Sequence, residues 1–214
     1  MDIGPDGQLV REWPGRLSVM VSHVCALGDG TTLVAADGHE PPGVLQLGPT
    51  GDTLQHLPLP WPDIHTVSDL ARQARMAPLD DGSGCIFAFA LGRGFARIGP
   101  EGAAYGVPYV EDFDFSPTVT VPYGQGTRTS FTNAVVYATF NPSVDRDTLV
   151  VLFIGPRGEH HKRFLDHYDT STGAYLYSRL LDAPASSAVR VNGTYFVTKL
   201  DGDFPSLTAM RPRR

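Results

Sequence analysis

The residues best suited to metal chemistry are a group of histidines in the second half of the chain. His160 and His161 follow Glu159, and His167 comes six residues after His161. Imidazole nitrogens are common zinc ligands, but the side chains of adjacent residues in an extended chain point to opposite sides. The group also follows a glycine-proline turn. We therefore predict exposed loop histidines here rather than a zinc site.

A second candidate for metal binding is a group of carboxylates near the middle of the chain. Glu111, Asp112 and Asp114 carry the hard oxygen ligands that calcium prefers. Alternation along an extended chain would send Glu111 and Asp112 to opposite faces, and their spacing matches no defined calcium loop. We predict solvated carboxylates, and we keep a metal site formed by Glu111, Asp114 and Asn133 as the alternative.

Motifs for nucleophilic catalysis and phosphate binding are missing from the sequence. No Gly-x-Ser-x-Gly motif occurs, and the Gly-Ser-Gly at 82–84 lies in a predicted hairpin turn. The Gly-Arg-Gly at 92–94 lacks the strand-to-helix context of a phosphate-binding loop. These absences predict a protein without catalytic residues and without a cofactor.

Residues 111–130 differ in composition from the strands around them. They contain Pro117, Pro122, Gly124 and Gly126, which predicts an irregular insertion loop. Long irregular insertions in compact domains are often functional. We predict partner contacts in this insertion and in the basic tail, through Phe113, Phe115, Tyr123, Arg128, Arg211, Arg213 and Arg214. The alternatives are a surface excursion or a linker for the insertion, and a solvated tail for the arginines.

The elements that would position these residues are marked by a repeated phrase, an aliphatic residue followed by Gly-Pro-x-Gly. Its copies begin at residues 3, 47, 98 and 154, so they start 44, 51 and 56 residues apart. Proline presets the first central position of a turn, and glycine tolerates the positive φ of a chain reversal. A short phrase at this period indicates repeated supersecondary units built from antiparallel hairpins.

Each unit contains four short apolar stretches separated by turns, which is typical of a propeller blade. We predict an all-β, propeller-like fold with about four blades of four antiparallel strands. The predicted parts of this single domain are a closing strand at 1–16, blades at 17–60, 66–110 and 131–181, the insertion loop at 111–130, and a last blade with the basic tail at 182–214. The last blade is one strand short. One prediction is that the N-terminal strand completes it and closes the ring, and the alternative is an incomplete ring.

Two stretches carry a resemblance to a known family. The phrase at 98–102 and the run Leu-Asp-His-Tyr-Asp-Thr-Ser-Thr-Gly-Ala-Tyr-Leu at 165–176 resemble the bacterial six-bladed β-propeller proteins of the NHL-like group. That resemblance implies a propeller fold, in a family that includes enzymes, ligand binders and protein-docking modules. This chain departs from the family because it has room for about four blades.

Composition narrows the class of protein further. The net charge of −6 argues against a nucleic-acid partner, and no apolar run is long enough to span a membrane. Cys25 and Cys85 are too few for a disulfide framework, so we predict two buried free thiols, with a single bridge as the alternative. The start has no secretory signal, which predicts the cytoplasm, or the periplasm if Met1 is not the true start.

Together these observations predict a non-catalytic interaction or scaffold module that acts as an accessory subunit of a larger protein assembly. A small or open propeller would gain from a partner that covers its exposed edges. We expect the partners to be other protein subunits, including those of a membrane complex. The alternative is a small-ligand-binding or metal-dependent, lactonase-like hydrolase propeller.

Overall fold

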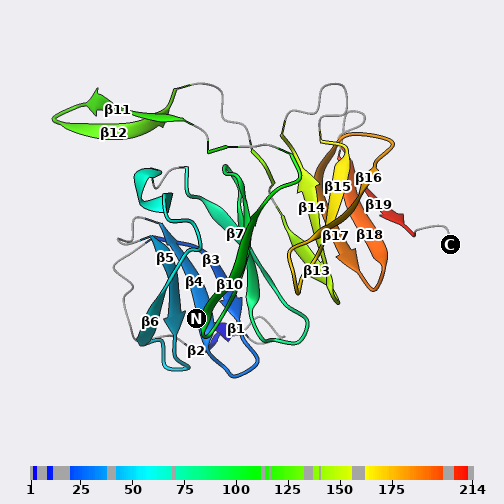
Figure 1. The fold of residues 1–214 in the computed structure, drawn as a ribbon, viewed down its shortest axis with the longest axis horizontal. Coiled ribbons are helices and arrows are strands. Elements are labelled where there is room, and N and C mark those ends of the chain that lie inside the picture. The colour runs from blue at the N-terminus through cyan, green and yellow to red at the C-terminus, as the bar shows by residue number, and fades with distance from the viewer. Residues whose placement is uncertain are drawn as a thin grey trace.

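The protein is built almost entirely of antiparallel β-sheets (Figure 1). The computed structural model describes residues 2–3, 9–11, 20–37, 42–68, 71–111, 114–115, 117–132, 137–139, 141–155, 162–199 and 205–211. Within these ranges a single short 3-10 helix, η1 (Ile64–Thr66), accompanies the strands. No helix in this part of the chain has the length and apolar content needed to cross a membrane.

Three sheets have four strands each, and a fourth sheet has three. In the order of the strands across each sheet, blade 1 contains β3 (Met20–Ala26), β4 (Thr32–Asp37), β5 (Gly43–Leu47) and β6 (Thr53–Pro58), and blade 2 contains β7 (Ala74–Pro78), β8 (Cys85–Phe89), β9 (Gly94–Gly99) and β10 (Gly102–Pro108). Blade 3 contains β13 (Ser143–Asp145), β14 (Thr148–Phe153), β15 (Phe164–Asp169) and β16 (Tyr175–Leu180), and blade 4 contains β17 (Ala185–Val191), β18 (Thr194–Lys199) and β19 (Ser206–Met210). The predicted all-β fold of repeated antiparallel blades is confirmed.

Two of the four Gly-Pro-x-Gly phrases form turns as predicted, whereas residues 4–7 of the first copy lie outside the described residues. In blades 1 and 2 the phrase joins the third strand to the fourth, and its last glycine has a positive φ, 88° at Gly51 and 110° at Gly102. These are backbone conformations that glycine adopts without a steric penalty. The fourth copy begins directly after β14, one hairpin earlier in its blade, and its residues 156–158 lie outside the described residues.

The core lies between the blades rather than within one sheet. Separate apolar clusters join blade 1 to blade 2, blade 2 to blade 3, and blade 3 to blade 4. The first strands β3, β7, β13 and β17 are neighbours in succession along the arc. Each blade therefore depends on its neighbour to bury its apolar face, as in other repeat architectures.

The two cysteines form a disulfide bond, so the prediction of two free thiols is wrong. Cys25 in β3 and Cys85 in β8 face each other across the junction of blades 1 and 2, with their Cα atoms 6.5 Å apart. Both are buried in the apolar cluster of that junction. The bridge adds a covalent link between two blades that also share an apolar cluster and a hydrogen bond from the Gly28 N–H to the Gly82 carbonyl.

The N-terminal residues also differ from the prediction. Of residues 1–16, the structure describes β1 (Asp2–Ile3) and β2 (Leu9–Arg11), which pair with each other. In Figure 1 they lie by blades 1 and 2, while β19 of blade 4 lies on the other side of the molecule. Blade 4 therefore has three strands among the described residues, and β2 does not close the ring there.

The predicted irregular insertion at 111–130 contains a regular hairpin instead. β11 (Thr118–Tyr123) pairs in unbroken register with β12 (Gly126–Phe131). Alternating threonine and valine favour a strand, and Pro122 is tolerated because a two-stranded ribbon consists of edge strands only. Figure 1 shows this hairpin extending away from the blades.

Candidate partner-binding site

The end of the β11–β12 hairpin carries two of the residues predicted to contact a partner. Tyr123 is 65% exposed, and the guanidinium carbon of Arg128 lies 4.9 Å from the centre of its ring. Val121 is the cross-strand partner of Arg128, and Val119 is also exposed. The hairpin thus presents an aromatic ring, a cation and aliphatic side chains to solvent.

The base of the hairpin is anchored on blades 1 and 2. Phe115 packs edge-on against Phe89, with ring centres 4.9 Å apart, at the margin of the core between these blades. The guanidinium carbon of Arg93 lies 5.2 Å from the centre of the Phe115 ring. Thr118 Oγ1 donates a hydrogen bond to Ser68 Oγ at 3.0 Å. Phe115 therefore holds the hairpin in place, which differs from the direct partner contact that was predicted for it.

A groove of about 430 Å³ lies beside this base. Its lining residues come from the segment around η1, from the β8–β9 turn and from the start of the hairpin: Asp63, Thr66, Val67, Ser68, Ala71, Arg93, Asp114, Phe115, Pro117 and Thr118. Arg93 Nη2 donates to Asp63 Oδ2 at 2.6 Å, and this hydrogen bond lowers the pKa of the Asp63 carboxyl. The groove is therefore lined by an ion pair and an aromatic ring.

The other predicted site residues do not gather at this place. Arg211 is exposed and comes just after β19. β19 lies on the opposite side of the molecule from the hairpin (Figure 1). Phe113, Arg213 and Arg214 lie outside the described residues. The predicted contacts are thus divided between a hairpin and a distant tail.

The structure brings no metal-ligand set together in the part of the chain that it describes. Asp114 Oδ1 accepts the backbone N–H of Phe115 at 2.8 Å. It also lies 3.8 Å from Arg93 Nε, so the positive charge beside this carboxylate is a guanidinium. Asn133 falls outside the described residues, as do His160 and His161. No three His, Cys, Asp or Glu side chains within the described ranges are placed to hold one ion, Glu111 included.

A second groove, of about 510 Å³, lies between the turns of blades 2 and 3. It is lined by Leu79, Asp80, Asp81, Arg97, Arg146, Asp147, Thr170 and Ser171. Two of its lining residues share a hydrogen bond, because Asp80 Oδ2 accepts the backbone N–H of Arg146 at 2.6 Å. A third, Thr170, accepts at its carbonyl oxygen from the hydroxyl of Tyr105, which is not a lining residue, at 3.0 Å. Burial raises the pKa of Tyr105 to about 12, so this hydroxyl keeps its proton. These hydrogen bonds therefore join blade 2 to blade 3.

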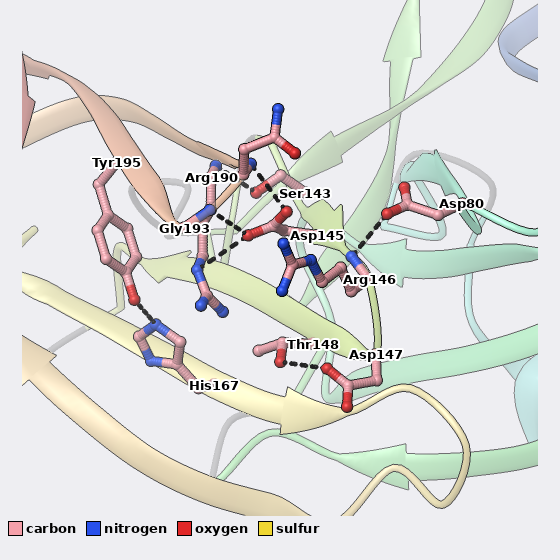
Figure 2. A network of polar contacts seen from close by, with 11 residues as sticks. Asp80, Ser143, Asp145, Arg146, Asp147, Thr148, His167, Arg190, Gly193 and Tyr195 are labelled. Carbon is pink, nitrogen blue, oxygen red and sulfur yellow. Dashed lines mark hydrogen bonds and ion pairs between the residues drawn. The ribbon is translucent and has the colours of Figure 1, made fainter. Parts of the chain in front are cut away.

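Blade 4 is held against blade 3 by a buried carboxylate. Asp145 in β13 accepts the backbone N–H groups of Asn192 and Gly193 at 2.9 and 2.8 Å, and its Oδ2 lies 3.1 Å from Arg190 Nε. Figure 2 shows this carboxylate between the β17–β18 turn and the arginine. Asn192 and Gly193 both have positive φ, as in a tight hairpin turn. Asp145 thus fixes the turn of the last blade.

His167 joins the same junction and is not the exposed loop histidine that was predicted. It lies in β15 with no exposed surface, and its Nε2 lies 2.8 Å from the hydroxyl of Tyr195 in β18 (Figure 2). Its Nδ1 is 3.3 Å from the carbonyl oxygen of Tyr177, whose ring stacks on the imidazole at 4.2 Å. A carbonyl only accepts, so Nδ1 donates and Nε2 accepts the tyrosine proton. His167 stands between Leu165 and Tyr168 in an apolar stretch of the third predicted blade, and this position was the signal that could have placed it in a strand.

Burial lowers the pKa of His167 from 6.5 to about 4, and this shift predicts a loss of stability in acid. The unfolded chain binds a proton near pH 6.5, whereas the folded chain resists protonation until about pH 4. The free energy of unfolding should therefore fall as the pH drops through this window, by about 3 kcal/mol, and the effect should level off below it. Urea unfolding at a series of pH values measures the slope.

The control for this prediction is the variant His167→Asn, which removes the titrating group. His23 also has a pKa lowered by burial, so only the difference between the two proteins reports on His167. We expect the pH slope of the variant to be smaller than that of the unaltered protein between pH 6.5 and 4. Equal slopes would show that the pKa of His167 is not lowered in the folded protein.

Solved structures that resemble this chain are β-propellers, and the chain has their fold. It aligns with BBS1N, solved in complex with ARL6DN, at 12% identity over 99% of this chain and 57% of that one, with a TM-score of 0.56. The periplasmic gluconolactonase PpgL of Pseudomonas aeruginosa aligns at 16% identity over 94% of this chain and 56% of that one, with a TM-score of 0.50. The dihydro-heme d1 dehydrogenase NirN aligns at 11% identity over 99% and 40%, also with a TM-score of 0.50.

The chain therefore spans about half the length of the propellers that it resembles. No protein-family model matches it, and no curated protein matches it either. At these identities the likeness establishes the fold and nothing of the activity.

Proposed function

We propose that the chain is a non-catalytic β-propeller interaction module, an accessory subunit whose protein partner binds the β11–β12 hairpin. The observation that carries this proposal is the hairpin itself. It extends away from the blades with side chains exposed along both strands (Figure 1). An isolated two-stranded ribbon is marginally stable in water, so a hairpin with an anchored base and an exposed end is suited to contact another protein.

The chemistry at the end of the hairpin supports the same proposal. Tyrosine and arginine are the residues most often found at the energetic centre of protein interfaces. Here Arg128 already lies over the Tyr123 ring, which restrains both side chains before a partner arrives. Such restraint lowers the entropy lost on binding. The anchoring of Phe115 at the base restrains the direction of the whole hairpin.

Several finer assignments belong to this proposal. We retain the units 17–60, 66–110, 131–181 and 182–214 as blades, and the resemblance to the NHL-like group of bacterial propellers.

Disulfides persist mainly in oxidising compartments, so the bond between Cys25 and Cys85 favours the periplasm over the cytoplasm. The described residues do not support the lactonase-like alternative, because no three His, Cys, Asp or Glu side chains gather among them, and its third predicted ligand, Asn133, lies outside them.

Truncating the two hairpin residues tests the proposal. We expect Tyr123→Ala and Arg128→Ala each to weaken binding of the native partner at least about thirtyfold, because truncating a residue at the energetic centre of an interface costs about 2 kcal/mol or more. Neither change should alter the free energy of unfolding by more than about 0.5 kcal/mol, since both are surface substitutions. Affinity capture from native extract, quantified for each variant, provides the measurement.

The matched control is Leu54→Ala, an exposed apolar residue on the edge strand β6 of blade 1. The Leu54→Ala variant should capture the same amount of partner as the unaltered protein. Equal recovery of the same partner with all three variants would reject the hairpin as the binding site.

A further inference from the structure

The register of the β11–β12 hairpin fixes which of its backbone groups face outward. At the base of the hairpin, the N–H of Thr132 donates to the carbonyl oxygen of Pro117 at 3.1 Å. Hydrogen-bonded and non-hydrogen-bonded pairs alternate along antiparallel strands. The non-hydrogen-bonded pairs are therefore Thr118 with Phe131, Thr120 with Thr129, and Pro122 with Thr127. The backbone groups of these six residues point away from the hairpin, along its two outer edges.

The two outer edges differ in what they offer to another strand. On the β11 edge, Pro122 has no N–H, and proline is a residue that protects sheet edges from pairing. On the β12 edge, Thr127 and Thr129 each present an N–H and a C=O, and β12 is exposed from Gly126 to Thr129. No strand among the described residues pairs with this edge. The hairpin thus has one blocked edge and one open edge.

The open edge carries a single charge. Arg128 is the only charged residue between Asp114 and Asp145, in a chain with a net charge of −6. Its guanidinium lies over the ring of Tyr123, and no carboxylate of the described residues forms an ion pair with it. An antiparallel strand added to β12 places one residue directly opposite Arg128, in a non-hydrogen-bonded pair where the side chains are closest. An opposite charge at that position is favourable and a like charge is unfavourable.

Gly126 leaves space on the same face of the hairpin. It is the cross-strand partner of Tyr123, and it lies two residues before Arg128. Because Gly126 has no side chain, a large apolar side chain of an added strand can extend over it to the ring of Tyr123. A third strand also stabilises a two-stranded ribbon, which is marginal alone.

We propose that the partner adds an extended, antiparallel strand to the edge of β12, with a carboxylate opposite Arg128 and a large apolar side chain opposite Gly126. This inference rests on the proposed function and gives the chemistry of the partner's binding segment. Hydrogen bonds with the backbone of Thr127 and Thr129 supply affinity, and the side chains on alternate positions supply specificity, as is general for strand addition. The guanidinium disfavours basic strands at the same edge.

Peptide display on the full chain tests the proposal. The probe is a phage library of random peptides of about ten residues, the length of a long strand. We expect the enriched peptides to share an Asp or Glu followed two positions later by a large apolar residue. Thr129→Pro should raise the dissociation constant of these peptides at least about tenfold, because it removes an outward N–H and obstructs the edge.

The matched control is Thr120→Pro. Thr120 is the cross-strand partner of Thr129 and is exposed on the other edge of the hairpin. Both substitutions place proline at a non-hydrogen-bonded position, as Pro122 already is, so both variants should fold, and circular dichroism checks this. Thr120→Pro should leave peptide binding unchanged.

A charge exchange tests the register without the use of proline. Arg128→Glu should weaken binding of the acidic peptides at least about tenfold, because like charges then lie opposite each other. Replacing the carboxylate residue of the peptide with lysine should restore binding to the Arg128→Glu variant. A failure of this exchange to restore binding would contradict the proposed register.

Equal binding by the Thr129→Pro and Thr120→Pro variants would overturn strand addition to β12. If Tyr123→Ala abolishes binding in that case, the hairpin remains the binding site and the proposed function stands. Enrichment of no peptide would also overturn strand addition. It would leave the proposed function to its own test, the capture of the native partner by the Tyr123 and Arg128 variants.

Discussion

Replacing Cys25 and Cys85 together with alanine should lower the free energy of unfolding by about 4 kcal/mol. The bond closes a loop with a sequence separation of 60 residues, and cross-linking such a loop restricts the unfolded chain strongly. The bond also ties blade 1 to blade 2, and a loss of about 4 kcal/mol is a large share of the stability of a typical domain. Denaturant unfolding of both proteins under oxidising conditions measures the difference.

A reducing agent provides the control for this experiment. It should destabilise the unaltered protein by a similar amount, and it should have no effect on the double alanine variant. The destabilised protein should also show faster hydrogen exchange in β3 and β4, because these strands lose their covalent link to blade 2. Equal stability of the two proteins under oxidising conditions would contradict the contribution assigned to the disulfide.

The second large effect should come from Asp145. The variant Asp145→Ala leaves the amides of Asn192 and Gly193 without their acceptor, and Arg190 without its anion. Because the carboxylate is buried, we expect the free energy of unfolding to fall by about 3 kcal/mol. Hydrogen exchange should be accelerated most in β17 and β18, the strands joined by the turn that Asp145 holds.

Asp147→Ala is the matched control, because Asp147 is a neighbouring but exposed aspartate whose carboxylate accepts from the Thr148 hydroxyl at 3.1 Å. We expect it to cost no more than about 0.5 kcal/mol, as is usual for a surface substitution. If the two aspartate variants cost the same, the buried carboxylate does not hold blade 4 as described.

The parts of the fold that could be predicted are those encoded by local chemistry. The Gly-Pro-x-Gly phrases require tight turns wherever they occur, and apolar stretches on both sides of such turns pair as hairpins. That reasoning predicted blades at 17–60 and 66–110, and the structure has four strands within each of these ranges. It also placed Tyr123 and Arg128 on an insertion, because proline and glycine mark a departure from the repeat.

The parts that could not be predicted depend on contacts between blades. Cys25 and Cys85 meet only because β3 and β8 lie in facing sheets, and nothing in a separation of 60 residues indicates this. His167 lies beside a loop in the sequence but points at Tyr195 of the next blade. No sequence motif near Asp145 indicates its structural role, because its hydrogen-bond partners are backbone amides 47 and 48 residues further along the chain.

The insertion shows a different limit of sequence reasoning. Its prolines suggested irregular chain, yet Pro122 fits β11 because an edge strand can leave one side of its backbone unpaired. The anchoring of Phe115 on Phe89 also depends on tertiary structure. The sequence thus indicated which residue types occur at this site. Only the structure shows that Phe115 anchors the hairpin while Tyr123 and Arg128 are at its exposed end.

The account rests on the claim that the end of the hairpin binds a protein partner. Site-specific photo-crosslinking in cells tests this most directly, with p-benzoylphenylalanine introduced at position 123 and, as the control, at position 54. We predict that position 123 yields a discrete product heavier than 23.1 kDa, which contains peptides of one other protein, and that position 54 does not yield it. The absence of any such product at position 123, or the same products at both positions, would contradict the account.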